Sequence, residues 1–141
     1  MARSDSYPDR EYARWAATLL RVSLGTMYIA HALLKLLVFT LPGTARFFES
    51  VGLPAELAHV VFLAELTGGI ALVLGVYARQ VALGLVPVLL GAAWVHLPNG
   101  WVFNAEGGGW EYPVFLSVAS LVLWLIGDGA LALRRARSPS G

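Results

Sequence analysis

Four polar side chains in one apolar stretch of the sequence could do chemistry. The segment RVSLGTMYIAHALLKLL, residues 21–37, carries Arg21, Tyr28, His31 and Lys35 among aliphatic residues. Seven residues make almost two helical turns, so Arg21, Tyr28 and Lys35 would share one stripe of a helix. His31 precedes Lys35 by four residues and would lie on the same side. The segment therefore predicts a helix with one polar face, on which a histidine can exchange protons near neutral pH.

The composition indicates which class of protein contains this helix. The chain has 141 residues, of which 57% are hydrophobic and 13% are charged, and its mean hydropathy is +0.67. Such a chain has too little polar surface to cover a soluble domain, so an integral membrane protein is predicted. The net charge of +1 gives no reason to expect a nucleic-acid partner. Because cysteine is absent, no iron–sulfur cluster and no c-type haem attachment are expected.

The elements that position the polar residues are predicted from hydrophobic runs of about 20 residues, the length that crosses a bilayer. Four runs meet this criterion, at residues 15–41, 57–77, 81–97 and 112–133. We therefore expect an all-α fold, an integral membrane four-helix bundle over residues 15–133. Residues 1–14 and 134–141 would form an N-terminal and a C-terminal cytoplasmic tail.

Arginines predict the orientation of this bundle. Four spans place both tails and the turn after the second span on one side, which collects Arg3, Arg10, Arg14, Arg79, Arg134, Arg135 and Arg137. The other side carries Arg46 together with Glu49, Glu56, Glu106 and Glu111. Basic residues favour the cytoplasmic side, so both termini are predicted to be cytoplasmic. The excess of arginine and alanine over lysine is typical of a bacterial gene, so we expect the bacterial cytoplasmic (inner) membrane.

The predicted spans bring polar side chains from all four helices toward the outer half of the bundle. Lys35 lies roughly 9 Å below the outer end of the first span and Glu65 about 12 Å from the same side, so their depths are similar. His31 is about one turn deeper. The outer mouth would receive polar residues from the other two spans, namely His96, Glu111 and Tyr112.

Two interpretations of Lys35 and Glu65 are open at this point. A buried salt bridge can set the register of two helices without taking part in chemistry. Alternatively, His31 beside an acid and a cation can donate a hydrogen bond to a ligand and pass a proton. At the inner end, Arg21 is at the level of Asp128, where a structural ion pair is predicted. No metal site is expected, because the sequence contains no HxxxH spacing.

The order of these residues along the chain carries a family resemblance. The first helix has Arg21, Gly25, His31 and Lys35; the second has an acid followed by a glycine pair, Glu65, Gly68 and Gly69. Arg79 comes after the second helix, and the last helix begins with Glu111, Tyr112 and Pro113. In this order and spacing, nearly the whole chain resembles the DoxX family of small four-helix membrane proteins.

The resemblance implies a redox function in the membrane, similar to the membrane part of thiosulfate:quinone oxidoreductase. A membrane quinone would be the cofactor, and a soluble or peripheral oxidoreductase would be the partner. A quinone head group needs hydrogen-bond donors and a proton exchanger. The catalytic candidates are then His31, Lys35 and Glu65. The cofactor-binding candidates are Tyr28, His31, His96, Glu111 and Tyr112.

Two other classes of function are compatible with the same features. A non-enzymatic membrane scaffold or assembly factor for an oxidoreductase complex would need the polar residues only for stability and would bind through the loop of residues 101–110. A small-solute transporter would use the polar residues as a midplane site. Quinone-dependent turnover would identify the redox subunit, and substrate flux without an electron acceptor would identify the transporter.

Overall fold

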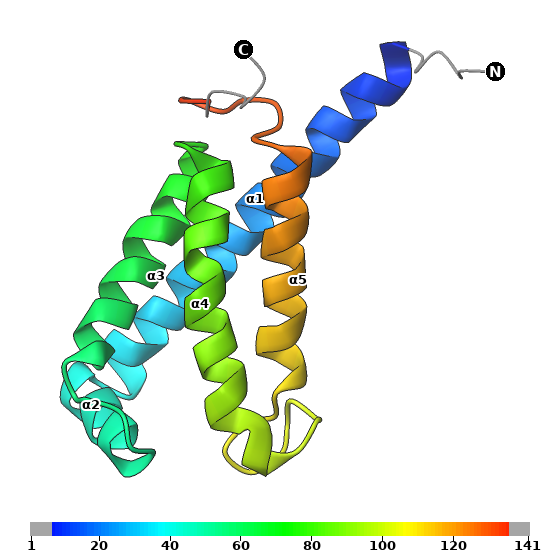
Figure 1. The fold of residues 1–141 in the computed structure, drawn as a ribbon. Coiled ribbons are helices and arrows are strands. Elements are labelled where there is room, and N and C mark those ends of the chain that lie inside the picture. Colours follow the sequence, from blue (N-terminus) through cyan, green and yellow to red (C-terminus); the bar gives the residue numbers. More distant parts are fainter. Residues whose placement is uncertain (1–6, 136–141) are drawn as a thin grey trace.

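The computed structural model describes residues 7–135 as a bundle of helices (Figure 1). The elements are α1 (Tyr7–Leu33), a π-helical turn η1 (Leu34–Val38), α2 (Leu41–Ser50), α3 (Leu57–Leu74), α4 (Ala78–His96), a 3-10 turn η2 (Leu97–Asn99) and α5 (Glu111–Ile126). Extended pairing within the described residues is limited to one isolated bridge between Val76 and Arg134. The predicted all-α class is confirmed.

Three stretches of these helices are long and apolar enough to cross a membrane: Asp9–Val38, Leu57–Leu74 and Ala78–Asn99. The remaining apolar helix, α5, is shorter. Within an apolar 18-residue window of each stretch, no more than 39% is buried inside the protein, so these helices keep much apolar surface outside the core. A helix satisfies its own backbone hydrogen bonds, so such surfaces suit a lipid environment.

The first helix differs from the predicted span at both ends. It begins at Tyr7, before the span predicted from residue 15, so residues 7–14 of the predicted tail are helical. Its α-helical part ends at Leu33, and the π-helical turn continues the apolar stretch to Val38. The other residues of the predicted tails, Arg3 and Arg137 among them, lie outside the described residues, with the exception of positions 134 and 135.

An additional helix, α2, lies between the first two predicted spans, where no element was expected. Thr40 caps this helix: its hydroxyl oxygen accepts a hydrogen bond from the N–H of Gly43 at 3.2 Å. Pro42 stands in the first turn, where its missing N–H costs nothing. The cap and the proline are the local signals for a helix start. Figure 1 shows α2 at the end of the bundle away from the chain termini.

The last helix ends at Ile126 rather than at residue 133 as predicted. Gly127 and Gly129 have φ values of 100° and 77°, which take the chain out of the helix. The segment that follows turns back across the end of α3. There the N–H of Leu133 donates to the Leu74 carbonyl at 3.3 Å, and the N–H of Arg134 donates to the Gly75 carbonyl at 3.0 Å.

The helices pack as two pairs, α1 with α3 and α4 with α5, joined by contacts of α3 with α4 and of α1 with α5. Figure 1 shows α1 crossing the other three at an angle. Small residues allow the closest approach: a Cβ atom on Gly25 would lie 2.7 Å from the Gly69 carbonyl oxygen. The buried core consists of Leu24, Tyr28, Leu72, Ala78, Ala82, Leu85, Leu89, Leu116, Ala119 and Leu123.

Candidate functional site

The structure brings Lys35 and Glu65 together. The Lys35 ammonium nitrogen lies 2.7 Å from Glu65 Oε2, and the side chains are 18% and 8% exposed. Lys35 stands on the π-helical turn η1, whereas Glu65 is buried in the middle of α3. Within the described residues this is the one salt bridge. It joins η1, the turn that directly follows α1, to α3 in the apolar part of the bundle, where either charge alone would be costly.

His31 has a different partner, on α5. Its Nε2 atom lies 3.1 Å from the Tyr112 hydroxyl oxygen. The two rings are also stacked, with centroids 5.3 Å apart and planes inclined by 25°. His31 is half-buried, and Tyr112 stands in the first turn of α5. The imidazole and the phenol therefore share one hydrogen bond in which the proton can sit on either side, depending on the tautomer.

Tyr28 is buried deeper in the same helix and contacts a residue that the sequence did not single out. Its hydroxyl lies 2.9 Å from the Ser120 hydroxyl on α5, and Ser120 is fully buried. The signal in the sequence was a serine in an otherwise apolar run, since a hydroxyl inside a membrane helix needs a partner. This contact fixes α1 against α5 one turn below His31.

His96 and Glu111 form their hydrogen bonds with the loop between α4 and α5 and not with His31, Lys35 or Glu65. The Asn99 amide donates to His96 Nδ1 at 3.4 Å and to the carbonyls of Gly107 and Gly108 at 3.0 and 2.9 Å. The Glu111 carboxylate accepts a hydrogen bond from the N–H of Phe103 at 2.9 Å. Both residues hold the loop between α4 and α5, because that loop folds back on itself and its backbone groups need partners.

Arg21 and Asp128, the predicted ion pair, interact electrostatically, while the direct hydrogen bonds of the Arg21 guanidinium go to backbone carbonyls. The Arg21 guanidinium donates to the carbonyls of Leu72 and Val73 at 2.7 and 2.9 Å, and to that of Ala130 at 3.1 Å. The last carbonyls of a helix lack partners within the helix, and a cation there also favours the helix dipole. Arg21 therefore closes the end of α3 by donating to its last carbonyl oxygens.

Asp128 also contacts the start of α4. Its Oδ1 accepts a hydrogen bond from the backbone N–H of Arg79 at 3.1 Å. The Arg79 side chain in turn donates to the Trp124 carbonyl at 2.8 Å, near the end of α5. Because α5 stops at Ile126, Asp128 lies in the segment beyond the helix, where it can reach this N–H. These contacts tie α4 to α5.

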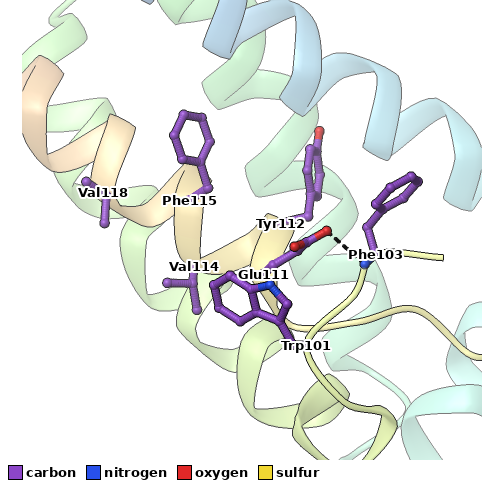
Figure 2. A pocket seen from close by; sticks show the side chains of 7 residues that line it. All are labelled: Trp101, Phe103, Glu111, Tyr112, Val114, Phe115 and Val118. Carbon is purple, nitrogen blue, oxygen red and sulfur yellow. Dashed lines mark hydrogen bonds between the residues drawn. The ribbon is translucent and has the colours of Figure 1, made fainter. Parts of the chain in front are cut away.

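An open, mainly apolar cavity of about 460 Å³ lies at the start of α5 (Figure 2). Its walls come from the loop before α5 and from α5 itself: Trp101, Phe103, Glu111, Tyr112, Val114, Phe115 and Val118. Tyr112 belongs to both features, since its ring lines the cavity and its hydroxyl reaches His31. Figure 2 also shows the Glu111 carboxylate turned to the N–H of Phe103.

The arrangement of these groups defines the chemistry that is available. A ligand in the cavity would meet aromatic and aliphatic walls, which include the Tyr112 side chain. A proton at the Tyr112 hydroxyl can be exchanged with His31 along their hydrogen bond. Within residues 7–135, no group of three or more histidine, aspartate and glutamate side chains is placed to hold a metal ion.

Comparison with known proteins gives a family and a relative. The model of the DoxX family matches residues 16–97, which include His31, Lys35 and Glu65. The "Putative oxidoreductase CatD" of Bacillus subtilis (strain 168) is 35% identical over 116 residues, which cover 82% of this chain and 81% of that protein. No solved structure matches the chain.

Proposed function

Because this chain belongs to the DoxX family of membrane proteins, we propose that it is the membrane subunit of a quinone-linked oxidoreductase. A soluble or peripheral oxidoreductase partner supplies the electrons, and the relative named as an oxidoreductase supports this class of activity. The observation that carries the proposal is the position of Tyr112. This residue lies between an open apolar cavity and a half-buried histidine.

The residues around the cavity fit a quinone head group. Ligand pockets typically measure about 300 to 1,000 Å³ and combine apolar walls with a few polar groups, and this cavity of about 460 Å³ lies within that range. Trp101 and Phe103 offer rings against which a flat ring can pack. Phe115 and Val118 are 68% and 53% exposed, so the cavity opens toward the surface that lipid would cover.

Each polar residue has a defined part in the proposal. A quinone bound there would accept two electrons and two protons. The Tyr112 hydroxyl donates a hydrogen bond to a carbonyl oxygen, and His31 replaces the proton at that hydroxyl. Lys35 and Glu65 hold α1 against α3, so that His31 keeps its place opposite Tyr112. Tyr28 and Ser120 fix the same two helices, α1 and α5, at a deeper level.

The proposal includes α5 as a fourth span and both termini on the cytoplasmic side of a bacterial inner membrane. Sixteen residues extend about 24 Å as a helix, close to the roughly 30 Å of a hydrocarbon core. The outward side chains of α5 are apolar, as lipid contact requires. The arginines gathered at the end of the bundle that holds Arg14, Arg79 and Arg135 support the orientation.

Quinone binding to the purified protein in lipid nanodiscs tests the proposal. Short-chain ubiquinone and menadione analogues are titrated, and the dissociation constant is read from quenching of tryptophan fluorescence, since Trp101 lines the cavity. We expect Tyr112→Phe, which keeps the ring and removes the hydroxyl, to raise the dissociation constant about threefold to tenfold, the effect of one hydrogen bond. His31→Ala should weaken binding in the same direction.

Matched controls come from exposed residues of the same types. His59→Ala and Tyr12→Phe alter side chains that face outward and should leave the dissociation constant unchanged. Saturable binding that is indifferent to Tyr112→Phe and His31→Ala would place the quinone elsewhere. Absence of quinone binding to the wild-type protein would overturn the redox proposal in favour of a scaffold.

A further inference from the structure

A second cavity, of about 470 Å³, lies at the opposite end of the bundle from η1 and has basic walls. Three segments form it: the first turns of α1, the start of α4 and the segment after α5. Its charged lining residues are Arg14, Arg79, Arg135 and Asp128. Positive charge therefore exceeds negative charge around this cavity, although the cavity is built from segments far apart in the sequence.

The three arginines differ in whether their guanidinium groups form hydrogen bonds within the protein. The Arg79 guanidinium donates to the carbonyls of Trp124 and Leu125 at 2.8 and 3.4 Å. Arg14 and Arg135 are exposed. Within residues 7–135 the one salt bridge is that of Lys35 with Glu65, so neither of these guanidinium groups takes part in one. Two forked donors are thus available at the cavity for a ligand.

The backbone holds Arg14 in place at the cavity. Its carbonyl oxygen accepts hydrogen bonds from the Thr18 hydroxyl at 3.0 Å and from the N–H of Ala130 at 3.2 Å. Arg135 comes from the segment that passes over the same end, close enough to Arg21 to interact electrostatically. The position of the positive charge is therefore set by the fold and not only by the local sequence.

The neighbourhood of the cavity indicates where the ligand comes from. Trp15 and Tyr77 are 49% and 44% exposed at this end of the bundle, and such rings gather at the level of lipid head groups. The remaining walls include Ala13, Ala16 and Ile126, which suit the apolar part of a lipid. Basic pockets between membrane helices bind anionic lipid head groups, and the arginine fork matches phosphate oxygens.

We infer that this arginine-lined cavity binds the phosphate group of an anionic phospholipid, with Arg14 and Arg135 as its main ligands. The apolar walls favour a lipid over free phosphate as the source of that group. The inference does not depend on the proposed redox function, because the cavity shares no residue with the quinone site. Lipid bound there would join the start of α1 to the segment after α5.

Thermal unfolding of the purified protein in a neutral detergent tests this inference. Short-chain phosphatidylglycerol is added in increasing amounts, and the concentration that gives half of the maximal rise in Tm is recorded. We expect this concentration to be at least tenfold higher for the double variant Arg14→Gln/Arg135→Gln than for wild type. Arg46→Gln removes an exposed arginine at the other end of the bundle and should behave as wild type.

Two further titrations, with phosphatidylcholine and with inorganic phosphate, identify the ligand. Phosphatidylcholine, which carries the same phosphodiester with a compensating cation, should raise Tm much less than phosphatidylglycerol, and inorganic phosphate at equal concentration should have no effect. Equal responses to both lipids, or an unchanged response of the double variant, would overturn the inference. An equal response to inorganic phosphate would show that the site takes the free anion and not a lipid. The Tm of the double variant without lipid checks that it folds.

Discussion

At the scale of single residues, the end of α1 and the turn η1 that follows it contact two neighbouring helices. Lys35 meets Glu65 on α3, and His31 meets Tyr112 on α5. The two contacts have different physical roles. The ion pair removes the cost of two charges in an apolar surrounding, whereas the histidine and tyrosine hold a proton that can move. This division favours a structural role for Lys35 and a chemical role for His31.

The ion pair gives a prediction about stability. Lys35→Met would leave Glu65 buried without its cation, so the free energy of unfolding should fall by about 3 to 5 kcal/mol. The double variant Lys35→Met/Glu65→Leu removes both charges and should recover most of that loss. Chemical denaturation in detergent measures both values. Equal stability of Lys35→Met and wild type would show that the contact does not stabilise the bundle.

At the scale of elements, the contact of α1 with α3 depends on two glycines. A Cβ atom on Gly25 would lie 2.7 Å from the Gly69 carbonyl oxygen and 2.9 Å from the Val73 nitrogen. These are backbone atoms, so a rotamer change cannot relieve the clash. Small residues at such crossings let membrane helices approach closely, and here the approach sets the reach of Arg21 and Lys35 from α1 to α3.

Gly25→Ala should therefore separate α1 from α3. We expect a loss of about 1 to 3 kcal/mol in the free energy of unfolding, the usual cost of overpacking. Gly84→Ala on α4 is the matched control, because a Cβ atom there would meet nothing within 4 Å. That variant should be neutral or more stable by up to about 1 kcal/mol, the difference in helix propensity. A loss of the same size in both variants would contradict the close contact.

At the scale of the whole molecule, backbone contacts close both ends of the bundle. At the end that holds the described start of α1, the segment after α5 binds the last carbonyls of α3, and Arg21 joins all three parts. At the other end, Asn99 and Glu111 hold the loop between α4 and α5. Polar groups are thus concentrated where the protein would leave the membrane.

The proposed orientation gives a prediction that labelling can check. The chain contains no cysteine, so single cysteines report their own position. In intact cells, a membrane-impermeant maleimide should label Glu49→Cys and Glu106→Cys, which replace exposed residues on α2 and on the loop before α5. It should not label Glu11→Cys or Gln80→Cys until the cells are opened. The reverse pattern would invert the proposed orientation.

The sequence by itself determined the class of the protein and the position of its apolar segments. Hydropathy and helical spacing are local properties, so they placed the polar stripe of Tyr28, His31 and Lys35 on one helix face. They also placed Glu65 at the depth of Lys35, because helical rise is constant. The order of polar residues and glycines likewise carried the family resemblance, which the family match confirms.

Only the tertiary structure decided which partner each polar side chain takes. The Arg21 guanidinium donates to helix-terminal carbonyls, and the Glu111 carboxylate accepts from the N–H of a loop residue. These outcomes depend on where α5 ends and how the loop before it folds. A buried donor bonds to whichever acceptor lies nearest in space, and a single sequence gives depth along each helix but not the distances between helices.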